Sequence, residues 1–390
     1  MDLQIFSIPQ IQAERMFDTL PLHSGVREDL QVRLLILGGG SVGQAVLLQA
    51  MNQAVLTSTN SVRIDVVDRA PEEAADALAR HFSQDYVERE GNSFRISSRN
   101  ADGELQIRFH GYALRSMALA EFLRTVQQGP EPYTYVAVCL PNPDDNLYCS
   151  YLFEQVFGEN IGCTALAFRM SQSPIMQAHL QNLPWCGRVI FLGTGEEYIG
   201  LSQVVDIPEE QRIRKYNHMY SLITSGMYRS PCADPETLWN QLLYFKRESN
   251  RALYHHQSAK KYMCGLQSAQ DPAGIEKQWK RFIEDYVSSQ EDPQKTYSLW
   301  LISRNPDGSL RFPDLVEAAM TEHRRFCYNM ASRGWGHVPD PEKLTQKVHA
   351  CLVPWQVLEQ ENSDKLIYDL ISAPWLLQEA AARLACKTKK

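Results

Sequence analysis

The run "LLILGGGSVGQAVLLQA", from Leu34 to Ala50, constrains the fold more than any other feature of this sequence. An apolar stretch with strand character ends in three consecutive glycines, and a helical pattern begins directly after them. Gly38, Gly40 and Gly43 fit the spacing G-x-G-x-x-G. In this motif the first glycine allows a tight turn, the second lets the backbone approach a pyrophosphate, and the third lets helix and strand pack closely. The sequence therefore predicts a strand, a phosphate-binding turn and a helix N-terminus that favours anions.

An acidic residue follows at the expected distance. The segment "VRIDVVD" predicts a second strand that ends at Asp68, 25 residues beyond Gly43, where a carboxylate can accept hydrogen bonds from ribose hydroxyls. The neighbouring Arg69 could stack on adenine or pair with a 2′-phosphate, but Asp68 would repel that phosphate. We therefore favour an NAD-like over an NADP-like ligand. The alternative is a glycine turn that is kept only for packing, in a sheet that has lost its ligand.

Strand and helix patterns alternate from residue 32 to about residue 200, which predicts an α/β fold with a doubly wound parallel sheet covered by helices on both faces. The predicted strands are 33–38, 62–68, 135–141, 163–169 and 188–193, with a hairpin over 94–110 that turns at Asp102-Gly103. The predicted helices are 41–53, 71–86, 115–127, 146–157 and 175–183.

The remaining chain has a different character. Residues 1–30 predict a helical lead-in, and from residue 201 onward helical spacing dominates, interrupted by Pro, Gly and Asp clusters near 230, 271, 290 and 310. We expect a Rossmann domain over 31–200, a helical region over 201–300, a second helical unit over 301–377 and a tail over 378–390.

Composition excludes several classes of protein. With 390 residues, 44% of them hydrophobic, the chain can bury more than one core. The net charge is −7 and the 39 Lys and Arg residues are scattered, which argues against a nucleic-acid duplex as partner. We find neither a secretory signal pattern nor a long uncharged apolar run, and therefore expect a cytoplasmic protein without membrane insertion. Nine cysteines without a CxxC pair argue against a metal site or a disulfide framework.

Residues 32–200 resemble the TrkA-N or KTN type of nucleotide-binding domain, found in prokaryotic regulators of potassium transport. The resemblance rests on the glycine turn, on Asp68 and on the segment "VAVCLPNPDDNLYCSYLFEQ", where an Asn opens a helix, with an Arg after the next strand. It implies that NAD(H) or a related adenine nucleotide is bound and not consumed. The family's Gly-Asp pair after the third strand is Gly111-Tyr112 here, so that acidic contact is missing. The candidate cofactor-binding residues are Gly38, Gly40, Ser41, Val42, Gly43, Asp68, Arg69, Leu140, Asn142, Asn146 and Arg169.

The segment "EHRRFCYNMASRGWGHVPDPEKLTQKVHACLVPWQVL", residues 322–358, resembles the ryanodine-receptor-like (RyR) repeat domain, a small helical module. The matching features are "EHR", the Gly-Trp pair at 334–335, His349 and "LVPW" at 352–355, whereas Phe326 stands where that family usually has Trp. An earlier segment, "LLYFKRESNRALYHHQSAKKYM", resembles the first half of the same module, so the helical part could hold two degraded copies.

The RyR resemblance implies a ligand pocket in which flat rings lie beside cations. Its candidate residues are Arg247, Asn250, Arg251, His255, Lys260, Glu322, His323, Arg324, Trp335, His349 and Trp355. The alternative is that both tryptophans are core residues and that His323 is a structural histidine held by Glu322.

Together the two resemblances favour a non-catalytic nucleotide sensor in signalling, ion-transport regulation or defence. In this interpretation a ligand between the two halves changes their docking or the oligomer, which we expect to be a homodimer acting on a separate effector or channel chain. One alternative is an NAD-dependent oxidoreductase, although we find no Tyr-x-x-x-Lys pair and assign no catalytic residue. Another is a protein-interaction scaffold with a vestigial Rossmann domain.

Overall fold

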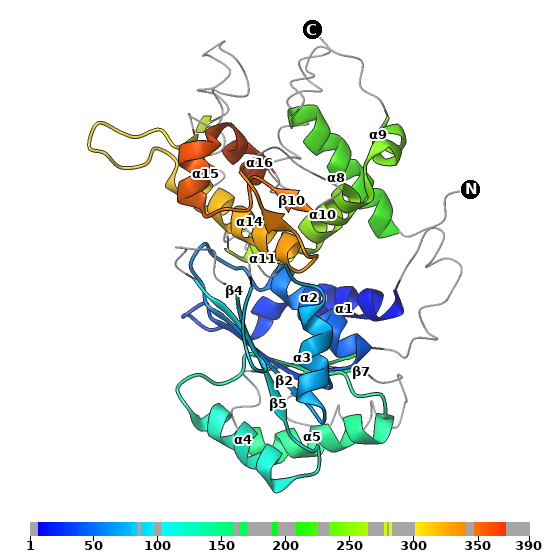
Figure 1. Cartoon of the computed structure of the whole chain (residues 1–390). Helices are drawn as coiled ribbons and strands as arrows, with labels where there is room; N and C mark the ends of the chain where they lie inside the picture. Colours follow the sequence, from blue (N-terminus) through cyan, green and yellow to red (C-terminus); the bar gives the residue numbers. More distant parts are fainter. Residues whose placement is uncertain are drawn as a thin grey trace.

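The computed structural model of the chain describes residues 7–83, 87–96, 103–158, 164–169, 189–192, 208–224, 234–263, 277–278, 281–282, 301–339 and 347–371. The predicted helix over 175–183 and the tail over 378–390 lie outside these ranges. The described chain forms an α/β half and a helical half, which lies above the sheet in Figure 1.

The sheet has eight strands in the order β3-β4-β5-β2-β1-β6-β7-β8. Their bounds are β1 (Val32–Leu37), β2 (Val62–Asp68), β3 (Glu88–Glu90), β4 (Ser93–Ile96), β5 (Leu105–Gly111), β6 (Tyr135–Val138), β7 (Ala165–Arg169) and β8 (Val189–Leu192). Along the sheet from β5 to β8, every pair of neighbouring strands is parallel. The pairs β3–β4 and β4–β5 are antiparallel. The parallel strands follow the chain order of a Rossmann sheet, with the order reversing between β1 and β6. The predicted α/β class with a mainly parallel sheet is confirmed.

The predicted hairpin is present as the antiparallel pair β4 and β5. The sequence analysis did not predict β3, which pairs with β4 across Gly91 and Asn92. Gly91 has a φ of +59°, a backbone conformation that glycine adopts without strain. The Gly-Asn pair was the available signal, because two-residue hairpin turns favour such residues.

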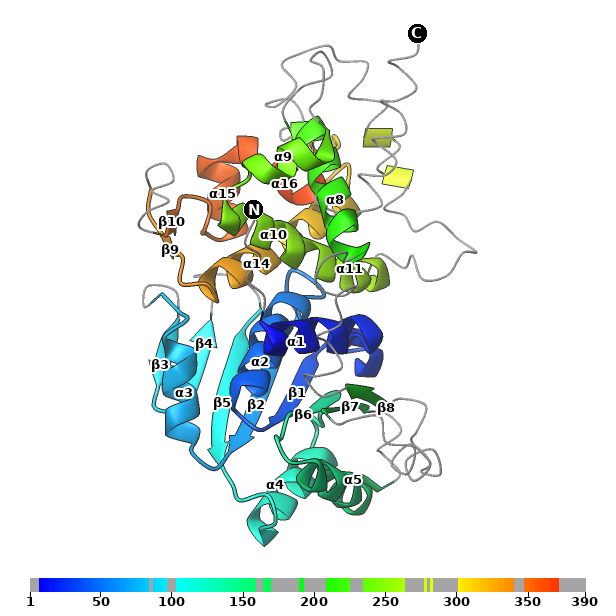
Figure 2. The same cartoon turned by 90° about the vertical axis from the view of Figure 1, so that its right-hand side faces the viewer.

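Helices cover both faces of the sheet, as predicted. Alternate residues of β1 point to opposite faces: Leu34 and Ile36 join the core beneath α1, α2 and α3, whereas Leu35 and Leu37 join the core beneath α4 and α5. The helices are α1 (Ile8–Thr19), η1 (Leu22–Gly25), α2 (Ser41–Gln53), α3 (Pro71–Ala79), α4 (Met117–Gln128) and α5 (Pro143–Phe157). Figure 2 shows the sheet with α2 and α3 in front of it and α4 and α5 near the carboxyl ends of its strands.

The helical half has one principal core. Tyr216 of α8, Leu315 of α14, Leu358 of α15 and Leu366 of α16 belong to the same buried cluster, so both predicted helical regions contribute to it. The elements are α8 (Pro208–Thr224), α9 (Pro235–Gln241), α10 (Tyr244–His255), α11 (Gln257–Met263), α14 (Pro313–Ala331), β9 (Gly336–His337), β10 (Val348–His349), α15 (Trp355–Glu361), η6 (Ser363–Lys365) and α16 (Leu366–Ile371). The short strands β9 and β10 pair in parallel.

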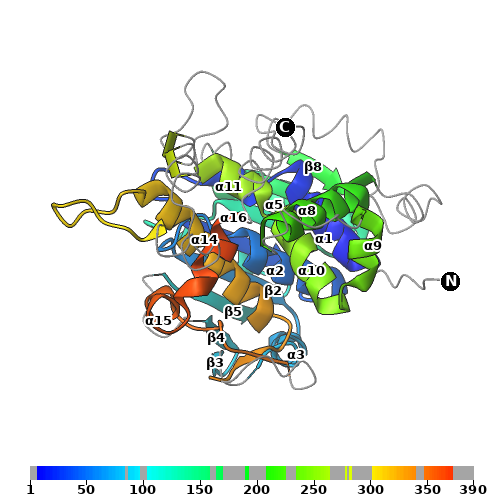
Figure 3. The same ribbon diagram turned by 90° about the horizontal axis from the view of Figure 1, so that it is seen from above.

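The two halves are packed tightly against each other. In Figure 3, α14 lies over the end of α2. Ala259 of α11 and Tyr328 of α14 are buried in the same core as Leu34 of the sheet. The contact involves the last turn of α2 and the loop before β2, which is at the amino ends of the parallel strands. The glycine turn follows β1 and therefore lies at the opposite edge of the sheet. The glycine turn and the contact between the two halves are therefore separate places in the fold. The sequence leaves open whether the two halves share one ligand or bind two.

Within the ranges that the structure describes, no helix combines the length and the apolar character needed to span a bilayer.

Candidate functional site

Each glycine of the turn after β1 has its own structural role. Gly38 has a φ of +99°, which a side chain would strain. A Cβ on Gly43 would lie 1.8 Å from the carbonyl oxygen of Gly38, so only glycine lets α2 pack on the turn. A Cβ on Gly40 would meet no atom within 4 Å, and Gly40 is the N-cap of α2. The backbone at Gly40 therefore borders open space, where a ligand could approach it closely.

The N-terminus of α2 is chemically open. No side chain of the described residues caps this helix, and its first turn contains no acidic residue. The first N–H groups of a helix have no partner within the helix and carry a partial positive charge. Ser41 is exposed and Val42 is buried at this end. The turn therefore offers backbone donors to a phosphate group.

Asp68 supports the glycine turn. Its Oδ2 accepts a hydrogen bond from the Gly39 N–H at 2.6 Å, and its Oδ1 accepts one from the Ala70 N–H at 3.0 Å. The sequence predicts that Asp68 binds a ribose and gives no sign of this contact with the turn. A carboxylate oxygen can accept a second hydrogen bond, so both roles are compatible. Arg69 beside it is exposed.

The carboxyl ends of β6 and β7 lie at the same edge of the sheet as the glycine turn. The amide Nδ2 of Asn146 donates to the carbonyl of Leu140 at 3.1 Å and to that of Arg169 at 2.7 Å. Asn146 is 1% exposed, yet its Oδ1 has no hydrogen-bond partner within the described structure, and neither does the buried Nε of Arg169. Asn142 caps α5 by accepting from the Asp144 N–H at 3.0 Å. Unpaired buried polar atoms are costly, which makes this end of β6 and β7 a candidate place for a polar partner.

This edge is also where the strand order reverses. In open α/β sheets, ligands bind outside the carboxyl ends of the strands at this switch point, which here falls between β1 and β6. At the end of β5, the ring of Tyr112 stacks on Phe122 with centroids 5.1 Å apart and lies near His110. An aromatic group thus occupies the place where the sequence analysis noted a missing acidic residue.

The RyR-like residues lie in the helical half, and several of them pair with one another. Glu322 on α14 is 3% exposed, and its Oε2 lies 2.5 Å from the Nζ of Lys260. The guanidinium of Arg325 donates to both oxygens of Glu322 and, through Nη1, to the Oδ1 of Asn52 at 2.8 Å. Burial alone would raise the pKa of Glu322, but the charges of Arg325 and Lys260 outweigh it and lower the pKa to about 2. Glu322 therefore acts as a buried counter-ion, and its partner Arg325 was not among the predicted site residues.

His323 is held on both sides of its ring. Its Nε2 lies 2.7 Å from the carbonyl oxygen of Val353, and its Nδ1 lies 3.1 Å from Oδ2 of Asp369. Trp355 contacts the same ring edge-on at 5.9 Å between centroids. Burial opposes the charge on the ring, but Cys327 and Asp369 raise the pKa of His323 well above its ordinary value. Asp369 is the partner that the sequence analysis missed.

Arg324 points to the α/β half. Its Nη1 donates to the carbonyl of Thr57 and to the Oδ1 of Asn60, each at 3.1 Å, and its guanidinium lies over the ring of Tyr328. Trp335 is buried against Phe245, with centroids 4.8 Å apart. Both tryptophans and Arg324 therefore take part in packing within and between the halves.

The residues predicted on α10 form a separate group. Arg251 pairs with Glu210 and Glu248, and together with Arg247 it lies over the ring of Trp239. The remaining predicted residues contact other partners: Asn250 contacts Asn217, His255 contacts Asp18 of α1, and His349 accepts from the Cys351 N–H. The structure does not bring the predicted RyR-like set into one cavity.

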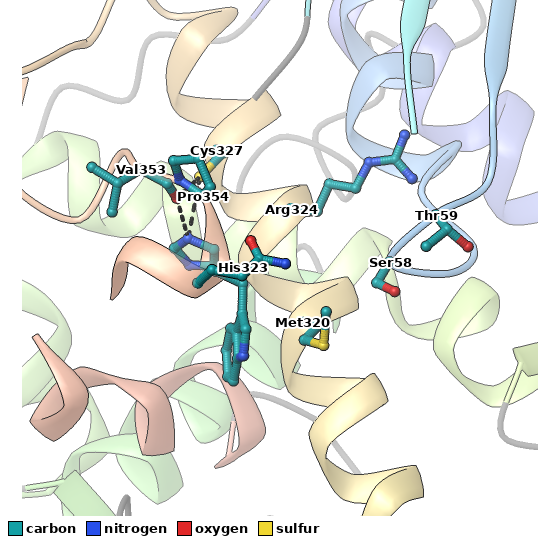
Figure 4. Close-up of a pocket in the computed structure, with 10 residues that line it drawn as sticks. Ser58, Thr59, Met320, His323, Arg324, Cys327, Val353 and Pro354 are labelled. Atoms are coloured by element: carbon teal, nitrogen blue, oxygen red, sulfur yellow. Dashed lines mark hydrogen bonds between the residues drawn. The ribbon is translucent and has the colours of Figure 1, made fainter. Parts of the chain in front are cut away.

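Three of its members, His323, Arg324 and Trp355, do line one small pocket together with Ser58 and Thr59 of the α/β half (Figure 4). The cavity is about 40 Å³, which suits a few water molecules and is too small for a nucleotide.

The mainly parallel sheet and the open glycine turn are compatible with a Rossmann-like α/β domain, to which a helical half is attached. No family model matches the chain, and no match was found among the curated proteins or the solved structures. In the described part of the chain, no cluster of His, Cys, Asp and Glu could hold a metal ion.

Proposed function

We propose that this protein is a regulatory protein that binds NAD(H) or a related adenine nucleotide at the glycine turn and does not consume it. The binding part of the proposal is supported by the open space at Gly40, the uncapped N-terminus of α2 and the unpaired polar atoms of Asn146 and Arg169. The resemblance of residues 32–200 to the TrkA-N type of domain points to the same class of ligand.

The regulatory part rests on one observation, the course of α2. This helix begins at Gly40 and ends in the contact with the helical half, where Asn52 donates to the Ala252 carbonyl at 2.8 Å and accepts from Arg325. With 13 residues it spans about 20 Å. A ligand that shifts the first turn of α2 thereby acts on the helical half, provided that it binds the two arrangements with different affinity. The resemblance of 322–358 to the RyR domain fits a module that responds to such a signal.

The test is calorimetric titration with NAD, NADH, ADP-ribose and ATP, together with native mass spectrometry of the purified protein. The wild type should bind one of these nucleotides and return it chemically intact. Gly40→Glu should abolish binding, because a carboxylate then occupies the place of the phosphates. Leu243→Glu adds the same group at the N-cap of α10, where the side chain is exposed, and should leave binding unchanged.

Two results would contradict the proposal. Oxidation of NADH with a carbonyl substrate would identify an oxidoreductase. Failure of the wild type to bind any of the four nucleotides would instead support a scaffold in which the glycine turn serves packing alone.

A further inference from the structure

Cys327 and His323 line the small pocket, and Asp369 contacts the far side of the histidine ring. The Sγ of Cys327 lies 3.7 Å from Nε2 of His323, and Nδ1 of the same ring lies 3.1 Å from Oδ2 of Asp369. Cys327 and His323 are four residues apart on α14, so their side chains share one face of the helix. Figure 4 shows both side chains beside the Val353 carbonyl. The arrangement places an oriented ring beside a thiol, and the same Sγ also lies 4.0 Å from the carbonyl oxygen of Val353.

The surroundings of His323 favour its charged form. The carbonyl of Val353 can only accept a hydrogen bond, and so can the carboxylate of Asp369. Both ring nitrogens therefore carry protons, which makes the ring an imidazolium. This charged ring lies 3.7 Å from the Sγ of Cys327, close enough to give a proton to a group that leaves beside the sulfur.

The other buried thiols have different environments. Cys139 and Cys149 lie in the α/β half, and burial raises the pKa of both, that of Cys139 to about 12. In the described structure neither is paired with an imidazole as Cys327 is. They are therefore internal comparators of similar burial.

The size of the pocket limits what can reach the sulfur. Cys327 lines the pocket although it is only 2% exposed, and the cavity of about 40 Å³ is walled by Met320, Pro354 and Trp355. Such a space admits a molecule of the size of a few waters. Peptides, nucleotides and bulky thiols do not fit into it.

We propose that Cys327 is a modification site for hydrogen peroxide, a small oxidant that enters this pocket and converts the thiol to a sulfenic acid. The proposal is independent of nucleotide binding at the glycine turn.

The chemistry requires no other reagent. After the thiol proton has passed to solvent, the sulfur attacks one peroxide oxygen, so that an S–O bond forms while the O–O bond breaks. The sulfur loses two electrons and the peroxide oxygens gain them. The departing hydroxide takes the Nε2 proton of His323 and leaves as water, and the ring regains a proton from solvent. The net change converts one thiol and one peroxide into one sulfenic acid and one water.

The experiment is a short pulse of hydrogen peroxide on the folded full-length protein, quenched with catalase and followed by unfolding in dimedone and peptide mapping. We expect the dimedone adduct to form at Cys327 about tenfold faster than at Cys149. The same pulse on urea-unfolded protein measures the reaction rate of each thiol without its folded surroundings. Cys327 should react more slowly there than in the folded protein, whereas a merely buried thiol reacts faster on unfolding.

Two variants test the role of the imidazole. His323→Gln should lower the rate at Cys327 about tenfold, and Asp369→Asn should lower it less, because the ring is kept but loses its carboxylate. Circular dichroism should show that each variant is folded before it is compared. The proposal is overturned if Cys327 reacts no faster than Cys149 in the folded wild type, or if folded His323→Gln reacts at the wild-type rate.

Discussion

Gly40 and Gly43 stand three residues apart in one turn, but their surroundings give them opposite tolerance to a side chain. A Cβ at position 43 would collide with the Gly38 carbonyl, whereas one at position 40 meets nothing within 4 Å. We expect Gly43→Ala to lower the free energy of unfolding by about 1–3 kcal/mol, because the backbone must move to relieve the overlap. Gly40→Ala should change it by less than about 1 kcal/mol. Urea denaturation of the three proteins measures both values.

The same pair separates folding from binding. Gly40→Ala should weaken nucleotide binding while it leaves the fold intact, because the second glycine is where backbone and pyrophosphate approach each other. Equal stability of Gly43→Ala and wild type would show that α2 does not pack on the turn as described.

Glu322 should make the protein sensitive to acid. Its pKa in the folded state is about 2, below the ordinary value of 4.5, so its stabilising contribution is fully present above pH 4.5 and is lost as the pH falls toward 2. The loss over this window is on the order of 3 kcal/mol. Denaturant unfolding at pH 6 and pH 3 should show about 2 kcal/mol of this loss, because pH 3 is still above the folded-state pKa.

Glu322→Gln is the control for this prediction. It should be less stable than the wild type at pH 6 by about 3–5 kcal/mol, because Lys260 and Arg325 then lack their counter-ion. Its stability should fall less than that of the wild type between pH 6 and pH 3. A parallel fall in both proteins would assign the acid sensitivity to other carboxylates.

At the level of elements, helices and strands whose ends carry clear sequence signals could be predicted. The predicted helix over 41–53 and strand over 62–68 agree with α2 and β2, because glycines and Asp68 mark their ends. The strand β3 was missed because three residues are too few to show a period. The carboxyl ends of these parallel strands meet at one edge of the sheet. The glycine turn and Asp68 could therefore be placed together from the sequence.

The burial of the polar side chains of α14 could not be predicted from the local sequence. The letters "EHRR" at 322–325 suggest a binding or solvated surface, but the structure buries all four side chains. Burial is possible because Glu322 and Arg325 meet Lys260 and Asn52, which are distant in sequence. Nothing in the local pattern identifies such partners. The binding role of the RyR-like residues stays a prediction.

Asn52 is the side chain through which the end of α2 meets the helical half. It is buried, donates to the Ala252 carbonyl and accepts from Arg325. We expect Asn52→Ala to cost about 2 kcal/mol of stability, because two buried polar groups lose their partner. Asn240→Ala, on an exposed face of α9, should stay within about 0.5 kcal/mol of the wild type. Similar losses in both variants would argue against a special role for Asn52.

In the whole molecule, the glycine turn and the helical half lie at opposite edges of the sheet. The two halves nevertheless share one buried core. The glycine turn is at the carboxyl edge of the sheet, the helical half packs on the amino edge, and Ala259 and Tyr328 extend the core of the sheet into the helical half. One ligand cannot contact both the glycine turn and the pocket at His323. In the proposed function, a signal from the nucleotide to the helical half passes through packed elements, of which α2 is the most direct.

Hydrogen–deuterium exchange with and without the bound nucleotide tests this central claim most directly. In the wild type, the nucleotide should slow exchange at the glycine turn, residues 38–43, and also in α14, residues 313–331. Gly40→Glu should show neither effect. Protection confined to the glycine turn would contradict the account, because the nucleotide would then be bound without any response in the helical half.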